Sequence, residues 1–299
     1  MLIHGVLIED TFAEAFPMRA TRLIVTAPER RWARIAAEAM TGFATSVIAC
    51  GCEAGIEREL DAAETPDGRP GVAVLLFAMG DADLARQLQN RVGQCVLTCA
   101  GTACFSGLEG DARAPLGKAL RFFADGFQSS KAIGGRRYWR LPVMDGEFVI
   151  EDMAGVASGV GGGNFLILAT TAQAALAAAE AAVQAMRQLP GIVLPFPGGI
   201  VRSGSKIGSR YKGLIASTND AYCPTIRAQS PRSALPPEVE SVLEIVIDGL
   251  SEQVVAEATA TGVRAACAQG RAGGIVAISA GNYGGQLGPF HFHLRRVLS

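Results

Sequence analysis

The sequence predicts an α+β protein built of two duplicated ferredoxin-like (βαββαβ) lobes with an inserted β-hairpin segment. In residues 1–100, and again in residues 165–299, the pattern runs strand, helix, strand, loop, strand, helix, strand. That order is the split β-α-β arrangement of ferredoxin-like folds. Residues 101–164 fit neither repeat. We therefore divide the chain into an N-terminal lobe (1–100), an inserted hairpin or oligomerisation segment (101–164) and a C-terminal lobe (165–299).

The elements of the N-terminal lobe follow from apolar runs separated by Pro and Gly signals. Pro28 and Glu29 begin the first helix and Gly42 ends it. A turn-rich segment, TPDGRPG, precedes the third strand. In order, we expect a strand at 23–26, a helix at 28–40, a strand at 46–49, a loop at 52–56, a strand at 72–77, a helix at 81–92 and a strand at 94–98.

The C-terminal lobe repeats this order. Its first helix is rich in alanine, the residue that favours helices most. The pairs Gly55-Ile56 and Gly199-Ile200 fall at matching places in the two lobes, which favours a duplication. In order, we expect a strand at 165–169, a helix at 171–187, a strand at 192–194, a long loop, a strand at 242–247, a helix at 251–267 and a strand at 275–279.

The segment between the lobes contains two strand-like runs, residues 137–143 and 147–151, joined by the turn Met144-Asp145-Gly146. This pattern predicts a β-hairpin. A hairpin without a helix of its own often docks on another lobe or another subunit. We expect an oligomer interface here.

Composition limits the classes of function. The chain is 49% hydrophobic and 18% charged, which indicates a well-filled core, and its net charge of −1 gives no basic field for nucleic acid. No signal pattern opens the sequence, and polar residues interrupt its longest apolar tract, so we expect a cytoplasmic protein without a membrane span.

The cysteines and histidines predict no metal site. Seven cysteines at irregular spacing suit reduced thiols better than disulfides. Cys50 and Cys52 have no second ligand pair to complete a zinc site. His291 and His293 would share one face of a strand, where histidines are usually surface residues.

Two glycine patterns resemble nucleotide-binding motifs, but their context is wrong. The glycines at 159–163 precede a strand, whereas a dinucleotide-binding loop follows a strand and opens a helix. The pattern Gly199-x4-Gly204-Ser205-Lys206 is displaced by one residue from a P-loop. With no Gly-x-Ser-x-Gly elbow either, the remaining chemistry is direct transfer between two bound ligands by positioning and oxyanion stabilisation.

Residues 195–225 form the stretch around which the chain is organised. A structureless loop of more than about 12–15 residues is uncommon unless it binds something. This one is dense in Gly, Ser, Thr and Asn, and four basic residues in it can meet anionic groups: Arg202, Lys206, Arg210 and Lys212. The alternatives are a mobile surface loop and plain surface charge.

The strand after this loop contains one carboxylate, Glu244, among apolar neighbours. Burial there would raise its pKa, so that a protonated carboxyl could donate a proton to an oxyanion or a leaving group near neutral pH. The alternative is a glutamate at a strand end that faces solvent or pairs with a base.

Ten blocks of the sequence, in order, resemble formylmethanofuran:tetrahydromethanopterin formyltransferases over essentially the full length. They are GVLIEDTFAEAF (5–16), TGFATSVI (41–48), 53–56, ETPDGRPG (64–71), GEFVIED (146–152), GGNF (162–165), PFPGGIV (195–201), ASTNDAYCPT (216–225), EIVIDGL (244–250) and ISAGNYGGQLG (278–288).

The resemblance implies reversible transfer of a formyl group between N5 of tetrahydromethanopterin and the amine of methanofuran. These two C1 carriers are substrates, and no prosthetic group is implied. The resemblance matches the family's buried glutamate to Glu244 as the catalytic residue. The residues expected to bind substrate are Ser205, Lys206, Thr218, Asn219, Asp220, Asn164, Phe127, Gln128 and Arg202.

Archaeal relatives are homo-oligomers, and the similar protein of methylotrophic bacteria is a subunit of a formyltransferase/hydrolase complex. This chain is near neutral and has only four lysines, unlike salt-adapted archaeal members, which favours the hetero-complex. The alternative function is a non-catalytic scaffold subunit of that complex. The presence of Glu244 and of the long loop argues against it, and a redox or nucleotide-binding enzyme is a more distant alternative.

Overall fold

The computed structural model describes all 299 residues and has a mixed α+β fold. Its main sheet is mostly antiparallel and contains 15 strands. The chain forms two compact units: Met1–Pro17 together with Val160–Ser299, called unit 1, and Met18–Gly159, called unit 2. Two long strands, β3 (Phe12–Thr26) and β11 (Met153–Ala169), each contribute to both units.

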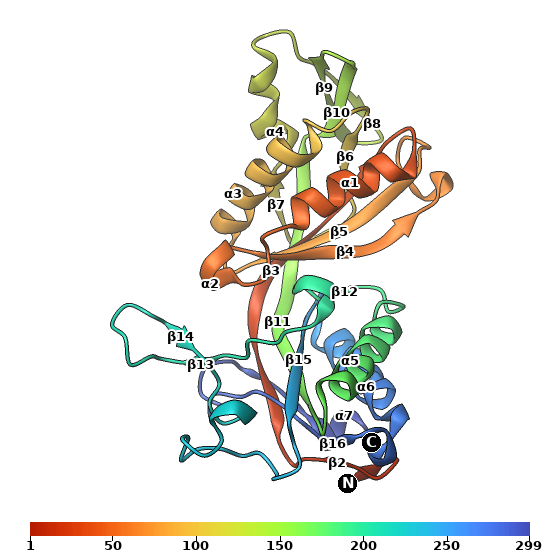
Figure 1. Cartoon of the computed structure of the whole chain (residues 1–299). Coiled ribbons are helices and arrows are strands. Elements are labelled where there is room, and N and C mark those ends of the chain that lie inside the picture. Colours follow the sequence, from red (N-terminus) through yellow and green to blue (C-terminus); the bar gives the residue numbers. More distant parts are fainter. The chain divides into compact units, whose positions relative to one another are not determined.

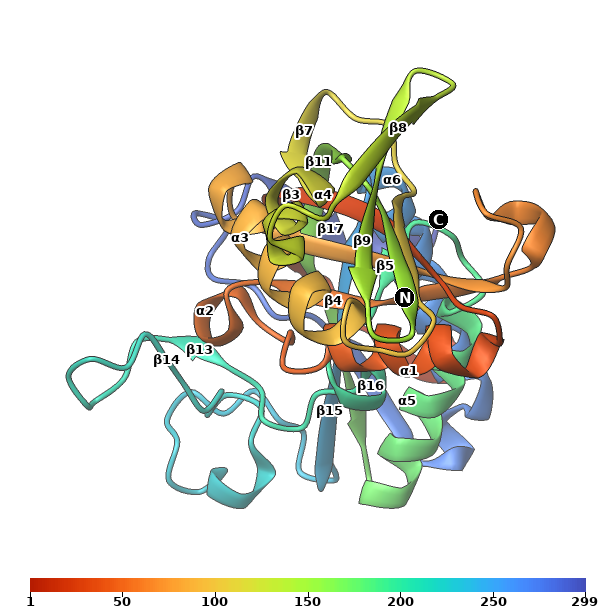
Figure 2. The same ribbon diagram turned by 90° about the horizontal axis from the view of Figure 1, so that it is seen from above.

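In unit 2 the strands run in the order β4, β5, β3 and β6, antiparallel throughout. Strand β10 continues this sheet parallel to β6, and β9 and β8 follow it antiparallel. Helices α1 and α3 pack on one face of the sheet and share a core with it (Figures 1 and 2). The bounds are α1 Arg30–Thr41, α2 Val47–Cys50, β4 Glu53–Leu60, β5 Gly71–Ala78, α3 Asp81–Arg91, β6 Ala103–Ser106, β7 Ala112–Pro115, α4 Gly117–Leu120, β8 Ser129–Ile133, β9 Arg136–Val143 and β10 Gly146–Glu151.

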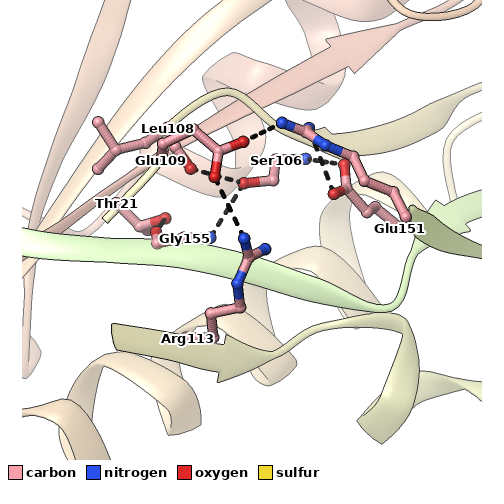
Figure 3. A network of polar contacts seen from close by, with 8 residues as sticks. Thr21, Ser106, Leu108, Glu109, Arg113, Glu151 and Gly155 are labelled. Atoms are coloured by element: carbon pink, nitrogen blue, oxygen red, sulfur yellow. Dashed lines mark hydrogen bonds and ion pairs between the residues drawn. The ribbon is translucent and has the colours of Figure 1, made fainter. Parts of the chain in front are cut away.

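The predicted hairpin at 137–151 is confirmed, since β9 and β10 pair antiparallel from Val143↔Gly146 onward. A polar network lies beside it (Figure 3). The Ser106 N–H donates to Glu151 at 3.0 Å, and the Ser106 hydroxyl accepts from the N–H of Gly155 at 3.0 Å. Glu109 pairs with Arg113 and with Arg136. This network joins β6, β10 and β11 within the unit.

Two predictions for residues 46–56 are wrong. The expected strand at 46–49 is instead the short helix α2, because the Ser46 side chain accepts a hydrogen bond from the N–H of Ile48 and Gly51 ends the helix with a positive φ of 75°. The expected loop at 52–56 lies mostly in strand β4. A run of four apolar residues suits a strand and a helix equally, and the cap decides between them.

The expected strand at 94–98 is also wrong. Residues 92–96 form a turn of π-helix that continues α3, and the fourth strand of this sheet is β6, which begins at Ala103. Val92 and Val96 are fully buried. These side chains are as buried as those of a core strand, although the backbone is still helical. A short apolar run is compatible with a buried strand and with a buried helix, so the sequence does not distinguish them.

In unit 1 the strands run in the order β12, β15, β11 and β16, antiparallel throughout. Strand β2 lies parallel to β16, and β1 pairs with β2. Helices α5 and α6 pack on one face, as Figure 1 shows. The bounds are β1 Leu2–Ile3, β2 Val6–Ile8, α5 Ala172–Met186, β12 Ile192–Val193, β13 Lys206–Ile207, β14 Ala216–Ser217, β15 Ser241–Gly249, α6 Glu252–Ala266, β16 Ile275–Ser279, β17 Phe290–His293 and α7 Leu294–Val297.

The glycines at 159–163 lie inside β11 and form no loop. A Cβ on Gly163 would lie only 2.5 Å from Cγ1 of Val255, so glycine here lets α6 approach the strand closely. The long loop, by contrast, remains largely irregular. Its only paired strands are β13 and β14, two residues each, whose hairpin extends away from β15 in both views (Figures 1 and 2), and short 3-10 turns lie at Pro197–Gly199 and Pro224–Ile226. No helix is long and apolar enough to span a membrane.

Candidate active site

The site is built on the face of β15 that points away from the helices. Successive side chains of a strand alternate between faces. Ile245 and Ile247 are fully buried in the core with α5 and α6. Glu244 therefore projects from the opposite face, beside Leu166 of β11, with which it is paired in register.

The long loop starts at the same point of this strand. The Val201 N–H donates to the carbonyl of Glu244 at 2.8 Å, and the Glu244 N–H donates to the carbonyl of Val201 at 2.9 Å. After this isolated bridge the chain leaves the sheet and returns to it only at β15, so residues 202–240, which include most of the long loop, lie between the two. The main chain of Glu244 thus fixes where the loop begins, and places its first residues beside the carboxyl group.

A small pocket of about 80 Å³ opens here. Glu244 lies in its wall together with Arg202, Asn219 and Tyr222, and Leu166 lines it from β11. No protein group hydrogen-bonds to the Glu244 carboxyl or pairs with it. Burial raises the pKa of this carboxyl to about 7. Near neutral pH the group is therefore present in both the acid and the base form.

Tyr283 reaches the same face from a loop near the C-terminus. Its phenol group is influenced by the hydroxyl of Ser205, which lowers the pKa of Tyr283. Burial raises the pKa of Tyr283, the Ser205 hydroxyl opposes this, and the charges of Glu244 and Glu14 raise the pKa further. Tyr283 therefore lies close enough to Glu244 for the two groups to interact electrostatically. Tyr283 belongs to one of the blocks that resemble the family, but it was not among the predicted site residues.

Tyr222 is a second residue of the site that was not predicted. Its hydroxyl lies 2.9 Å from that of Ser279 on β16, and the Ser279 hydroxyl donates to Glu9 at 2.5 Å. Burial raises the pKa of Tyr222, while its bond to Ser279 lowers it. Tyr222 is separated from Ser279 by more than fifty residues, so no local pattern indicates the contact.

Four predicted residues gather at or next to this pocket. Glu244, Arg202 and Asn219 line it, and Ser205 follows the lining residue Gly204. The Arg202 side chain is exposed and makes no hydrogen bond or ion pair with the rest of the chain. Thr218, next to Asn219, lies at the edge of the same loop segment.

Lys206 and Asp220 are paired with each other. The Lys206 ammonium lies 2.7 Å from the Asp220 carboxylate, which also accepts from Arg232 at 2.7 Å and from Ser230 at 2.9 Å. The hydrogen bond from Lys206 is the main cause that holds the pKa of Asp220 well below its usual range. The ion pair of Lys206 with Asp220 therefore joins the segment around residue 206 to the segment around residue 220 of the loop.

Asn164 lies on the same face of β11 as Leu166 and is buried. Its amide donates to the carbonyls of Gly162 at 3.2 Å and Gly281 at 3.1 Å, and it accepts from the Gly281 N–H at 2.6 Å. The amide thus holds the loop that carries Tyr283.

The last two predicted substrate-binding residues, Phe127 and Gln128, belong to unit 2. Phe127 is 79% exposed. The Gln128 side chain accepts a hydrogen bond from the Gly126 N–H at 3.0 Å. No group of three or more His, Cys, Asp or Glu side chains is arranged to hold a metal ion, and all seven cysteines are free.

A carboxyl group with a pKa near 7, without a partner in the wall of a pocket on an α+β scaffold, has the properties that general acid–base catalysis requires. The family model described as formylmethanofuran-tetrahydromethanopterin formyltransferase matches residues 1–143, and a model of the proximal lobe of the same family matches residues 146–297. The chain belongs to this formyltransferase family.

Individual relatives support the same family assignment. A formylmethanofuran–tetrahydromethanopterin formyltransferase of Methylococcus capsulatus is 65% identical, with 100% of both chains covered. One subunit of the formyltransferase/hydrolase complex of Methylorubrum extorquens is 56% identical, over 99% of this chain and 97% of that one.

Two solved structures have the same fold. The formyltransferase/hydrolase complex of Methylorubrum extorquens, solved with methylofuran, contains a chain that superimposes with a TM-score of 0.97 at 55% identity, covering 100% of this chain and 99% of that one. The formyltransferase of Methanosarcina barkeri gives a TM-score of 0.93 at 47% identity, covering 99% of this chain and 100% of that one.

Proposed function

We propose that this enzyme moves a formyl group reversibly between methanofuran and N5 of tetrahydromethanopterin, by direct transfer within a ternary complex. The observation that carries the proposal is Glu244, a carboxyl with a pKa of about 7 in the wall of a pocket at the start of the long loop. Relatives with up to 65% identity over the whole chain are named for this activity.

In the proposed mechanism the lone pair of the acceptor amine attacks the formyl carbon. A C–N bond forms, and the carbonyl electrons move to oxygen and give a tetrahedral intermediate. Protonated Glu244 hydrogen-bonds to this oxygen and then transfers its proton to the nitrogen of the departing amine, and the proton of the attacking amine returns to the carboxylate. When the C–N bond to the donor breaks, the formyl group has moved and Glu244 is again protonated.

The other predicted residues are assigned to ligand binding. Ser205, Thr218 and Asn219 would orient the carriers in the pocket, and Asn164 would support them through the loop at Gly281. Arg202 and Arg210 are exposed cations that would meet the anionic tails of the carriers. Lys206 and Asp220 would shape the loop through their ion pair. Phe127 and Gln128 remain predicted substrate contacts.

At the level of the fold, we propose two duplicated ferredoxin-like lobes. The proposal is supported by the equal antiparallel strand orders, β4-β5-β3-β6 and β12-β15-β11-β16, each with two helices on one face. In chain order, both correspond to second, third, first and fourth strand. The boundaries 1–100, 101–164 and 165–299 stay a prediction.

The partner proposal is a hetero-complex with subunits of the formylmethanofuran hydrolase type. It is supported by the relative from Methylorubrum extorquens, which is part of a formyltransferase/hydrolase complex. A homo-oligomer, an interface in the inserted segment and a cytoplasmic location stay predictions. So does catalysis without a prosthetic group.

The test is formyl exchange between formylmethanofuran and tetrahydromethanopterin, followed by pterin absorbance, with the full-length protein. Loss of one oxyanion donor typically lowers the rate about 10²–10³-fold. We expect Glu244→Gln to lose that much turnover while it remains folded. Near-normal turnover would remove Glu244 from the mechanism. A folded wild-type protein with no activity alone, but active with hydrolase subunits, would show dependence on partners, and inactivity in both would favour the scaffold.

A further inference from the structure

Glu14 is a buried carboxylate that no step of the proposed mechanism uses. It lies in the part of β3 that belongs to unit 1 and is 0% exposed. Burial opposes its ionisation, but four backbone N–H groups outweigh burial and hold its pKa below the ordinary value. The donors are the N–H groups of Tyr283 at 2.8 Å, Gly285 at 2.9 Å, Leu287 at 2.5 Å and Gly288 at 2.7 Å.

These bonds fold residues 281–288 around one carboxylate. The loop is also held at its start, where Asn164 binds both the N–H and the carbonyl of Gly281. At its end, a Cβ on Gly288 would lie 2.2 Å from the carbonyl oxygen of Ala15, so only glycine fits. The position of this loop is therefore set by groups that lie more than one hundred residues away in the sequence.

The loop delivers a single aromatic side chain to the site. The hydroxyl of Ser205, which directly follows the pocket residue Gly204, acts on the Tyr283 phenol and lowers its pKa. The charge of Glu244 acts on Tyr283 as well. One continuous path of contacts thus runs from the Glu14 carboxylate through the loop and Tyr283 to the part of the pocket wall that the long loop forms.

We infer that Glu14 and Tyr283 are positioning residues for formyl transfer: Glu14 fixes the 281–288 loop, and Tyr283 anchors Ser205 so that the pocket wall stays in place beside Glu244. The inference rests on the proposed mechanism. Neither residue exchanges a proton with the substrate. We call Glu14 and residues 281–288 together the clamp. The clamp orders the long loop before the carriers bind, so that less conformational entropy of the loop is lost on reaching the transition state.

The first test is a double-mutant cycle on the interaction between Tyr283 and Ser205. Loss of one hydroxyl–hydroxyl hydrogen bond would cost about 0.5–1.5 kcal/mol, or about 2–10-fold. We expect Tyr283→Phe to lower kcat by that factor with little change in KM, Ser205→Ala to lower kcat at least as much, and the double variant to be no worse than Ser205→Ala alone. Tyr138→Phe, a matched change in unit 2, should leave kcat unaltered. Additive effects, or no effect on kcat, would overturn the inference.

The second test is Glu14→Gln. A glutamine presents one oxygen and an N–H₂ group to four N–H donors, so the loop must open. We expect faster hydrogen–deuterium exchange in residues 281–288, a fall in kcat, and no further fall when Tyr283→Phe is added. Glu151→Gln is the control, since this buried glutamate in unit 2 accepts from the Ser106 N–H (Figure 3). It should leave both kcat and the exchange of 281–288 unchanged.

The outcomes separate the clamp from the proposed mechanism. A Glu14→Gln protein that opens the loop but keeps normal kcat would make the clamp merely structural and overturn the inference. If Glu14→Gln fails to fold, the Tyr283–Ser205 cycle decides alone. Glu244→Gln is measured in the same assay. If Glu244→Gln retains normal turnover, the proposed mechanism is wrong. The double-mutant cycle still shows whether the effects of Tyr283 and Ser205 on kcat are coupled.

Discussion

At the scale of single residues, Glu244 shows how a strand can tune a carboxyl group. Its strand neighbours on the other face are buried among helices, and its own face is closed by the loop that begins at Val201. No cation pairs with it, so burial acts unopposed and the pKa rises to about 7. The pKa of Asp220, which lies in the long loop, is instead lowered, because Lys206 pairs with its carboxylate.

The first prediction concerns the pH dependence of catalysis. If protonated Glu244 is the active form, kcat/KM should be constant below a pH of about 7 and fall toward tenfold per unit above it. The measurement is the rate of formyl exchange from mildly acidic to mildly alkaline pH. Glu244→Gln should lack this decline because it has no proton to lose. A wild-type profile that is flat across this range would contradict the assignment.

At the scale of elements, the long loop is irregular in sequence but fastened at defined points. It starts at the Val201–Glu244 bridge, its β13–β14 hairpin is paired at Lys206↔Ser217, and Asp220 binds Lys206 and Arg232. The loop's order therefore depends on few polar groups, which makes it sensitive to the loss of one of them.

The second prediction tests that dependence with Asp220→Asn. The change removes the negative charge that Lys206 and Arg232 share, so we expect a higher KM for the carriers. Trypsin should also cleave faster after the exposed Arg210 and Lys212. Asp83→Asn, which breaks an exposed ion pair with Arg86 in α3, is the control and should alter neither quantity. Unchanged cleavage and KM would show that the pair does not order the loop.

At the scale of the whole molecule, carboxyl groups with pKa values shifted in opposite directions contribute to the dependence of stability on pH. Glu14 and Asp220 have lowered pKa values, so their contribution is present above the unfolded values and is lost as the pH falls through the folded ones. The pKa of Glu244 is raised, so its contribution is complete below the unfolded value of 4.5 and is lost as the pH rises through about 7.

The third prediction follows from these signs. The free energy of unfolding should be largest at a pH of about 5 and decline on both sides. Glu244→Gln should remove part of the decline above that pH. Its advantage over wild type should be absent below pH 4.5 and grow to at most about 3.5 kcal/mol above pH 7, from about 1.4 kcal/mol per pKa unit. Urea unfolding followed by circular dichroism measures this.

The sequence by itself determined the elements with strong local signals. The helices at 171–187 and 251–267, the hairpin at 137–151 and the strand around Glu244 all lie where they were expected. The local pattern around Glu244 raised it as a candidate but left a solvent-facing glutamate as the alternative, and only the family resemblance favoured a catalytic role. The family resemblance is itself a local signal, since it rests on contiguous blocks, and the family assignment is confirmed.

Only the tertiary structure decided the short apolar segments and the surroundings of the site. Residues 46–49 and 94–98 are too short for periodicity to separate strand from helix, and capping and packing made them helical. Glu14 and Tyr283 meet across 269 residues, through hydrogen bonds from backbone N–H groups that every amino acid except proline carries. Such contacts leave no pattern in the sequence, because they depend on where the folded chain brings its ends together.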